Sequence, residues 1–242
     1  ACSPSVAGPR PDWVRVVPAP DAHRSDTAAA DFAAAVIEQI ADLDRSGIGF
    51  SALLVDTVFS SDGIQPGPLG HLAAVADIVR AAGGLFIADE VQPGFGRLGD
   101  GMWGFDRHGV VPDLVTIGKP MAAGMPVAAV VASTAVASAV GADLPYFNTF
   151  GGNPVSMAAA QAVLDVVREE NLIGNARDRG RDLVAGLEAL RREYPTIGDV
   201  RGAGLFVGVE FVTQPDGTVP DTTAAALVVN RLRDKGVLLS TA

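Results

Sequence analysis

Two chemically reactive side chains stand at the ends of two apolar segments of this chain. Asp89 closes the segment 85–89, and Lys119 follows the segment 114–117 after one glycine. Lys119 is one of only two lysines, beside sixteen arginines. If both segments are neighbouring strands of a parallel sheet, the two side chains face the crevice where open α/β sheets bind ligands. The pair suits pyridoxal phosphate chemistry, in which an amine forms a Schiff base with the cofactor aldehyde and a carboxylate keeps the pyridine nitrogen protonated.

The segments around this pair predict a sheet in which strands alternate with helices. Continuous apolar segments of strand length occupy residues 51–55, 85–89, 113–117 and 127–131. Apolar residues at helical spacing occupy residues 27–43, 72–82, 153–170 and 173–194. Strands without polar alternation are buried on both faces, so we predict the α/β fold class with a mostly parallel central sheet and helices on both faces. Segment 13–17 is a further candidate strand.

The last third of the chain predicts a change of architecture. Asn153 before Pro154 predicts a helix start, because asparagine caps helices and proline suits the first helical position. Beyond the helices, segment 204–212 alternates as a half-buried strand does, and a helix at 221–235 precedes a strand start at 237–239. We therefore predict a large domain over residues 1–195 and the start of a small α+β domain over residues 196–242.

Composition excludes several classes of partner and site. The formal net charge is -10 and the arginines are scattered, so we expect neither a nucleic acid nor a membrane partner. The single cysteine, Cys2, allows no internal disulfide and fits a reducing cytoplasm. His23, His71 and His108 lie far apart, with no cysteine or carboxylate at ligand spacing, so we expect no metal site.

Four motifs, in this order along the chain, resemble those of one enzyme family. They are residues 85–97 (LFIADEVQPGFGR), 111–127 (VPDLVTIGKPMAAGMPV), 148–154 (NTFGGNP) and 200–206 (VRGAGLF). The family is the class III, ornithine-aminotransferase-like family of pyridoxal phosphate enzymes, which have fold type I. The resemblance extends over about residues 12–240 and implies the large domain of that fold, followed by part of its small domain.

The resemblance implies a role for each of five residues. Lys119 would be the Schiff-base lysine, and Asp89 would pair with the pyridine nitrogen. Val91 would pack on one face of the cofactor ring, and Gln92 would reach its phenolic oxygen. Thr149 would bind the phosphate of the cofactor in the neighbouring subunit. The family thus implies pyridoxal 5'-phosphate as the cofactor and a homodimer with shared active sites.

Each of these residues also has an ordinary structural interpretation. Lys119 could be a solvated loop lysine, as most lysines are. Asp89 could be a turn or capping residue, and Thr149 a loop hydroxyl. The chain also starts at Ala1 and lacks segments that family members carry before and after the matching part. We therefore expect a piece of a longer enzyme, one chain of a split enzyme, or a degenerate relative.

One segment departs from the family pattern in a way that bears on the substrate. Residues 56–63 read DTVFSSDG, where aminotransferases of the family typically read Glu-Pro-Val-Gln-Gly-Glu-Gly-Gly. Ser61 stands in place of a glutamate that gates the substrate pocket. Together with segments 146–149 and 198–202, Ser60 and Ser61 are closer to the branch of phospho-lyases that act on amino-alcohol phosphates, although Ser61 could equally be neutral drift.

The sequence therefore supports three functions in order. The first is a cytoplasmic aminotransferase that moves an amino group between an amine or amino acid and a keto acid or aldehyde through Lys119. The second is a pyridoxal-phosphate-dependent phospho-lyase. The third is a non-catalytic fragment or fold relative that acts as a dimerisation partner.

Overall fold

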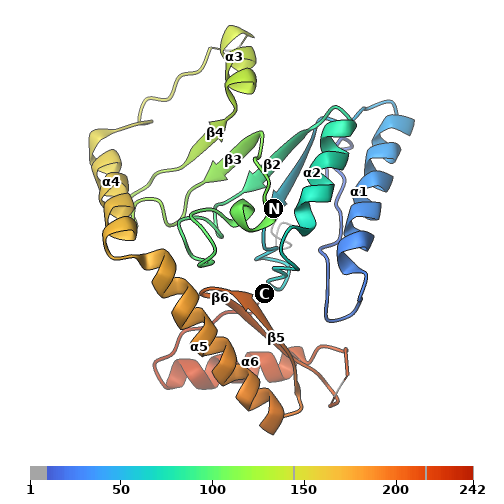
Figure 1. The fold of residues 1–242 in the computed structure, drawn as a ribbon, viewed down its shortest axis with the longest axis vertical. Coiled ribbons are helices and arrows are strands. Elements are labelled where there is room, and N and C mark those ends of the chain that lie inside the picture. Colours follow the sequence, from blue (N-terminus) through green and yellow to red (C-terminus); the bar gives the residue numbers. More distant parts are fainter. Residues whose placement is uncertain (1–9, 144, 216, 242) are drawn as a thin grey trace.

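The computed structural model describes residues 10–143, 145–215 and 217–241, so Cys2 lies outside the described part. Its larger sheet has the strand order β1 (Ala52–Asp56), β2 (Leu85–Asp89), β3 (Leu114–Ile117) and β4 (Ala129–Ala132) (Figure 1). β1, β2 and β3 are parallel, and β4 is antiparallel to β3. The predicted α/β class and mostly parallel sheet are confirmed.

Two helices and the sheet form the main hydrophobic core. α1 (Ala28–Arg45) and α2 (His71–Ala81) pack against each other, and α2 packs on β2. The helical spacing of apolar residues puts Phe32, Val36 and Ile40 on one buried face of α1. They meet the fully buried Phe86 of β2 in one cluster. This core holds the carboxyl ends of β1 and β2 in fixed positions.

A short 3₁₀ helix, η1 (Gly104–His108), closes the loop that follows β2. It packs so closely on the end of β1 that a Cβ atom at Gly104 would lie 2.1 Å from Thr57 Oγ1. Only glycine fits there, because a real Cβ atom cannot approach another atom so closely. Glycine at this position therefore permits the close packing of η1 on the end of β1.

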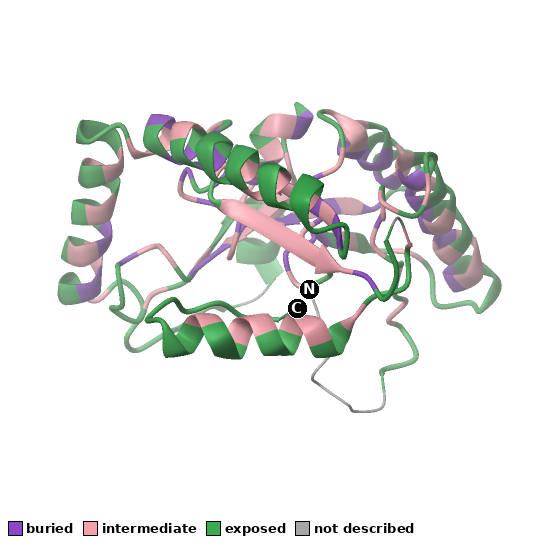
Figure 2. Ribbon diagram, turned by 90° about the horizontal axis from the view of Figure 1, so that it is seen from below, coloured by how far each residue is buried: buried purple, intermediate pink, exposed green. Residues whose placement is uncertain are grey.

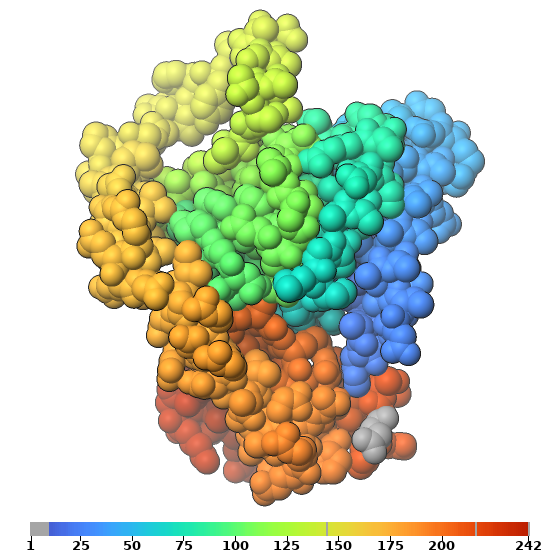
Figure 3. Space-filling model, viewed as in Figure 1, coloured from blue at the N-terminus to red at the C-terminus, as the bar shows by residue number. Residues whose placement is uncertain are grey.

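The chain then leaves the body of the molecule. α3 (Thr134–Asp143), which the sequence did not predict, and the segment 145–153 project from the main body (Figure 3). Asn153 begins α4 (Pro154–Glu169), and its side-chain oxygen accepts a hydrogen bond of 2.9 Å from Ser156 N. The predicted helix start is thus confirmed. α5 (Leu172–Glu193) follows directly.

A separate two-stranded antiparallel sheet follows α5. It consists of β5 (Ile197–Ala203) and β6 (Phe206–Phe211), with α5 packed on β5 and α6 (Thr222–Asp234) on β6. The described residues of α6 include none that is buried, and Figure 2 shows its outer face exposed. The domain boundary that we propose after residue 195 falls in the short link between α5 and β5.

Three local predictions were wrong. Segments 13–17 and 237–239 form no strand, because neither finds a strand to pair with among the described residues. Trp13 is instead 69% exposed. β5 was missed because its glycines, Gly198 and Gly202, break the apolar pattern; both are needed where Val212 and Val207 approach closely. Among the described helices, none has the length and apolar character needed to cross a membrane.

Candidate active site

The carboxyl ends of the three parallel strands bring polar side chains together. Asp56, Asp89 and Thr116 are register partners across β1, β2 and β3. Asp89 Oδ1 accepts hydrogen bonds of 3.1 Å from Val91 N and from Thr116 Oγ1. Both donors hold the carboxylate at the strand ends, near the start of the segment that carries Lys119.

A hollow of about 720 Å³ opens beside these strand ends. Three of the five predicted site residues, Val91, Gln92 and Lys119, line it together. Asp89 lies at the end of β2, two residues before Val91, and is not part of the lining. Thr149 is exposed on the projecting segment before α4 and is also not part of the lining.

The other walls of the hollow come mostly from segments that the sequence did not connect with the site, apart from Ser60, whose segment was already linked to the substrate. They are the loop after β1, Arg97, the β5–β6 connection and the segment after α6, which contribute Ser60, Ile64, Leu205, Phe206, Val207, Leu238, Leu239 and Ser240. No local sequence pattern could have found the residues of the last two segments, because Leu205 follows Lys119 by 86 positions and Leu238 follows it by 119.

Gln92 is held by the loop after β1. Its Nε2 donates to Ser60 Oγ at 2.6 Å and to Ser61 Oγ at 3.2 Å. Ser60 Oγ in turn makes a short hydrogen bond with Oδ2 of Asp56, which also accepts from Ser60 N at 3.0 Å. Asp56 is buried, and burial raises the pKa of its carboxyl, with the nearby Asp89 contributing in the same direction.

The same loop is fixed from the small sheet by one arginine. Arg201 Nε donates to the carbonyl oxygens of Gly63 at 2.9 Å and of Ile64 at 3.0 Å. Arg201 Nη1 is paired with Asp199 at 2.9 Å and with Glu210 at 3.0 Å. Because Ile64 has a φ of 60°, a strained value for a branched residue, the loop needs such external support.

A buried carboxylate lies directly behind the site. Glu90 is fully buried and accepts hydrogen bonds from Gly104 N at 2.7 Å, Phe105 N at 2.9 Å and Thr57 Oγ1 at 3.0 Å. Burial raises the pKa of Glu90 to about 7. The carboxylate thus ties the ends of β1 and β2 to η1, although its place beside Asp89 in the sequence gave no sign of this.

His108 of η1 lies on the other side of Thr57. Its Nε2 is 3.0 Å from Thr57 O, and its ring meets that of His71 edge to face at 4.5 Å. Burial lowers the pKa of His108 to about 4. Within the described ranges, no three histidine, cysteine or carboxylate side chains are grouped to bind a metal ion.

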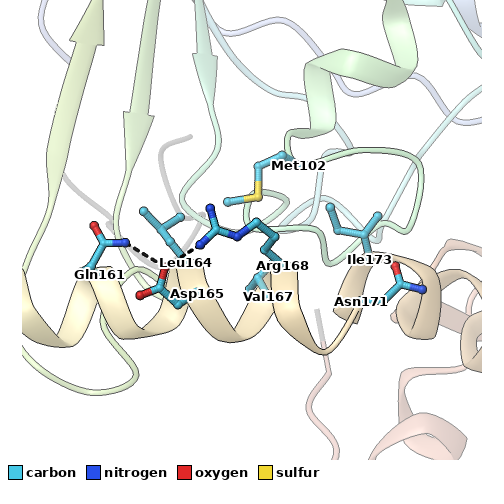
Figure 4. Close-up of a pocket in the computed structure, with 8 residues that line it drawn as sticks. All are labelled: Met102, Gln161, Leu164, Asp165, Val167, Arg168, Asn171 and Ile173. Carbon is cyan, nitrogen blue, oxygen red and sulfur yellow. Dashed lines mark hydrogen bonds and ion pairs between the residues drawn. The ribbon is translucent and has the colours of Figure 1, made fainter.

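A second hollow, of about 510 Å³, lies between α4, the start of α5 and Met102. Figure 4 shows that three of its polar side chains are engaged with each other, since Gln161 Nε2 and Arg168 Nη2 each donate to Asp165 Oδ1 at 2.9 Å. It contains none of the predicted site residues. The hollow at the strand ends is therefore the better candidate for chemistry.

The hollow at the strand ends fits pyridoxal phosphate. Its volume is within the range of ligand sites, about 300–1,000 Å³. It offers an amine on Lys119, an apolar surface on Val91 and an amide on Gln92, and a carboxylate is fixed at the adjacent strand end. These are the groups that hold an aldehyde, a ring face, a phenolic oxygen and a pyridine nitrogen.

Comparison with known proteins found a matching family model and similar proteins. The family model described as "Aminotransferase class-III" matches residues 5–242. The chain is 43% identical to "Alanine–glyoxylate aminotransferase 2-like" of Drosophila melanogaster, over 93% of this chain and 47% of that protein. It is 38% identical to "Ethanolamine-phosphate phospho-lyase homolog 1" of Caenorhabditis elegans, over 96% of this chain and 53% of that protein.

A solved structure is similar to the fold over almost the whole chain. It is a phospholyase from Arthrobacter in complex with phosphoethanolamine, with a TM-score of 0.90 and 39% identity over 98% of this chain and 57% of that one. The chain spans about half the length of the curated relatives it matches. The family implies pyridoxal phosphate as the cofactor. From the family match and these relatives, the chain belongs to the class III aminotransferase family of fold-type I enzymes.

Proposed function

We propose that the full-length protein is a pyridoxal-phosphate-dependent aminotransferase. The observation that carries this proposal is that Lys119 shares one hollow with Val91 and Gln92, beside the strand that ends on Asp89. The substrates would be a small amine or amino acid and a keto acid or aldehyde. The family match and the similarity to the Drosophila protein support the same reaction class.

In the proposed reaction, each residue of the site has its own role. Bound pyridoxal phosphate supplies an electron sink for the carbanion that forms at the substrate carbon. Lys119 would hold the cofactor through Nζ and would serve as the base and acid that moves the proton at the substrate carbon. Asp89 keeps a proton on the pyridine nitrogen, because a fixed carboxylate favours the cationic form of its partner.

We also propose a homodimer in which a second copy covers the projecting segment. Tyr146, Phe147 and Phe150 are 86%, 85% and 81% exposed, and none of the described residues of the apolar helix α3 is buried. An apolar surface of this extent marks an interaction site. Thr149 lies in the same segment, so it would reach the partner's cofactor phosphate there. The cytoplasmic location stays a prediction from composition.

Covalent trapping tests the role of Lys119. The full-length protein should bind pyridoxal phosphate, and borohydride reduction followed by peptide mapping should place the adduct on Lys119, because this residue lines the hollow. The second lysine of the chain, Lys235, provides an internal control. An adduct on Lys235, or none after incubation with the cofactor, would contradict the proposal.

The second candidate function is a phospho-lyase acting on an amino-alcohol phosphate. Ser60 lines the hollow, and both Ser60 and Ser61 bind Gln92. Ser61 in place of a carboxylate removes one source of repulsion for a dianionic substrate. The similarity to the Arthrobacter phospholyase and to the Caenorhabditis homologue favours the same alternative.

The two reactions leave the cofactor in different states. An aminotransferase should lose the visible absorbance of its bound cofactor with an amino donor and regain it only when a keto acid is added. We expect this result. Release of phosphate from phosphoethanolamine without any keto acid would instead establish the lyase. Failure of both reactions in a protein that binds the cofactor would support a non-catalytic role.

A further inference from the structure

Ser60 links a buried charge to the candidate active site. The residue is buried at the bottom of the loop after β1, between Asp56 and Gln92. Asp56 is 5% exposed, whereas Gln92 lines the hollow that contains Lys119. The three side chains form one continuous chain of hydrogen bonds from the end of β1 into the hollow.

The direction of each bond in this chain follows from the donors available. Asp56 accepts from Val58 N at 2.9 Å and from Ser60 N at 3.0 Å, so both of its oxygens act as acceptors. The one hydroxyl hydrogen of Ser60 therefore goes to Asp56, and Ser60 Oγ has only lone pairs left for Gln92. Gln92 must turn its Nε2 toward Ser60, as observed at 2.6 Å.

The second serine reinforces this orientation. Ser61 Oγ lies 3.2 Å from the same Nε2, so both amide hydrogens of Gln92 have an acceptor in the loop. The carbonyl oxygen Oε1 is the end of the amide that remains to face the hollow. The charged groups around the chain include Asp89 on the neighbouring strand, Glu90, which interacts electrostatically with Asp56, and Lys119 and Arg97 in the hollow.

We propose that Ser60 relays the charge of Asp56 to Gln92 and makes Gln92 present an acceptor oxygen to the hollow. Ser60 and Asp56 are thus positioning residues, and they act through Gln92. This inference rests on the proposed cofactor site. If Gln92 reaches the phenolic oxygen of the cofactor, an acceptor there favours the protonated phenol, whereas an amide N–H would favour the phenolate.

Two substitutions test the relay by different routes. Ser60→Ala removes the middle of the chain, so the amide of Gln92 can turn and donate to the cofactor. Asp56→Asn lets residue 56 donate to Ser60, whose hydroxyl hydrogen then becomes free to point at Gln92 Oε1. Both variants should turn the amide, and both should lower the pH midpoint at which the visible absorbance of the bound cofactor titrates.

The expected shift is about half a pH unit or more, as for gain or loss of one hydrogen bond to a titrating group. Ser46→Ala is the matched control, since the Ser46 hydroxyl donates to Leu43 O at the end of α1 and Ser46 does not line the hollow, so the midpoint should not move. Thermal unfolding of the full-length variants shows that they are folded. Should Asp56→Asn fail to fold, Ser60→Ala alone decides.

The outcomes separate the relay from the proposed function. A lower midpoint in Ser60→Ala, with Ser46→Ala unchanged, supports the relay. A bound cofactor whose midpoint is the same in the parent and in Ser60→Ala, or rises, overturns the relay and leaves the cofactor site intact. A parent protein without any cofactor absorbance overturns both the proposed function and the relay.

Discussion

Two buried ionisable side chains behind the hollow respond to pH in opposite directions. Glu90 and His108 both bind Thr57, one through the hydroxyl and the other through the carbonyl oxygen. The pKa of Glu90 is raised from 4.5 to about 7, so the folded state binds a proton that the unfolded state releases. The pKa of His108 is lowered from 6.5 to about 4, so the unfolded state binds the extra proton.

The two contributions to the free energy of unfolding therefore change with pH in opposite directions. The Glu90 contribution is fully present below pH 4.5 and is lost as pH rises to about 7. The His108 contribution is fully present above pH 6.5 and is lost as pH falls to about 4. Between about pH 4.5 and 6.5 the two slopes, each at most about 1.4 kcal/mol per pH unit, should largely cancel.

Single substitutions should reveal each slope. In Glu90→Gln, the free energy of unfolding should rise with pH between 4.5 and 6.5, because only the His108 slope remains. In His108→Gln it should fall over the same interval. Urea unfolding at several pH values measures both. The Glu90→Gln variant should also be less stable at pH 8, by about 1–3 kcal/mol, since an amide cannot accept from all three donors.

Parallel profiles for both variants and the parent would contradict this account. His23→Gln serves as the control, because it replaces another histidine that lies outside the pair and does not contact Thr57. Its profile should follow that of the parent protein.

Among the helices, α4 depends on its first residue. Asn153 Oδ1 accepts from Ser156 N at 2.9 Å, and Ser156 Oγ donates to Pro126 O at 3.1 Å. The cap therefore fixes both the helix and its attachment to the segment before β4. Asn153→Ala should lower the free energy of unfolding by about 1 kcal/mol, measured by urea denaturation.

The matched control at this position is Asn153→Asp. Aspartate keeps the acceptor and adds a negative charge at the positive end of the helix, so its stability should equal or exceed that of the parent. Equal losses in the two variants would show that the side-chain amide, and not the cap, stabilises this region.

At the scale of the whole molecule, the proposed dimer should share its active sites. A Lys119→Ala chain and a Thr149→Ala chain should each be inactive as homodimers. A mixed dimer would hold one site with both residues intact if Thr149 serves the partner. Random mixing should then restore about a quarter of the parent activity, since half of the dimers would carry one intact site of two.

A second mixture controls for this result. Lys119→Ala combined with the Lys119→Ala, Thr149→Ala double variant leaves no site with a lysine, so it should remain inactive. If proven mixed dimers of the single variants are equally inactive, Thr149 acts within its own subunit or has no role in cofactor binding.

The sequence by itself determined much of this protein. Apolar segments ending on Asp89 and before Lys119 predicted the parallel strands, because continuous apolar character reflects burial on both faces. Asn153 with Pro154 predicted a helix start, because capping depends on adjacent residues. Four ordered motifs predicted the family, which the comparisons confirm. Each of these signals is local in the chain.

Only the tertiary structure decided what lies around the site. Gln92 meets Ser60 across 32 positions, and Arg201 meets Gly63 across 138. The sequence of α3 has no amphipathic pattern, which agrees with the finding that none of its described residues is buried. Strand register and loop path set these contacts, and they depend on the packing of the whole molecule. For this reason the sequence predicted Lys119 and Gln92 as site residues, but the structure was needed to show that Ser60 and Ser61 hold the amide nitrogen of Gln92.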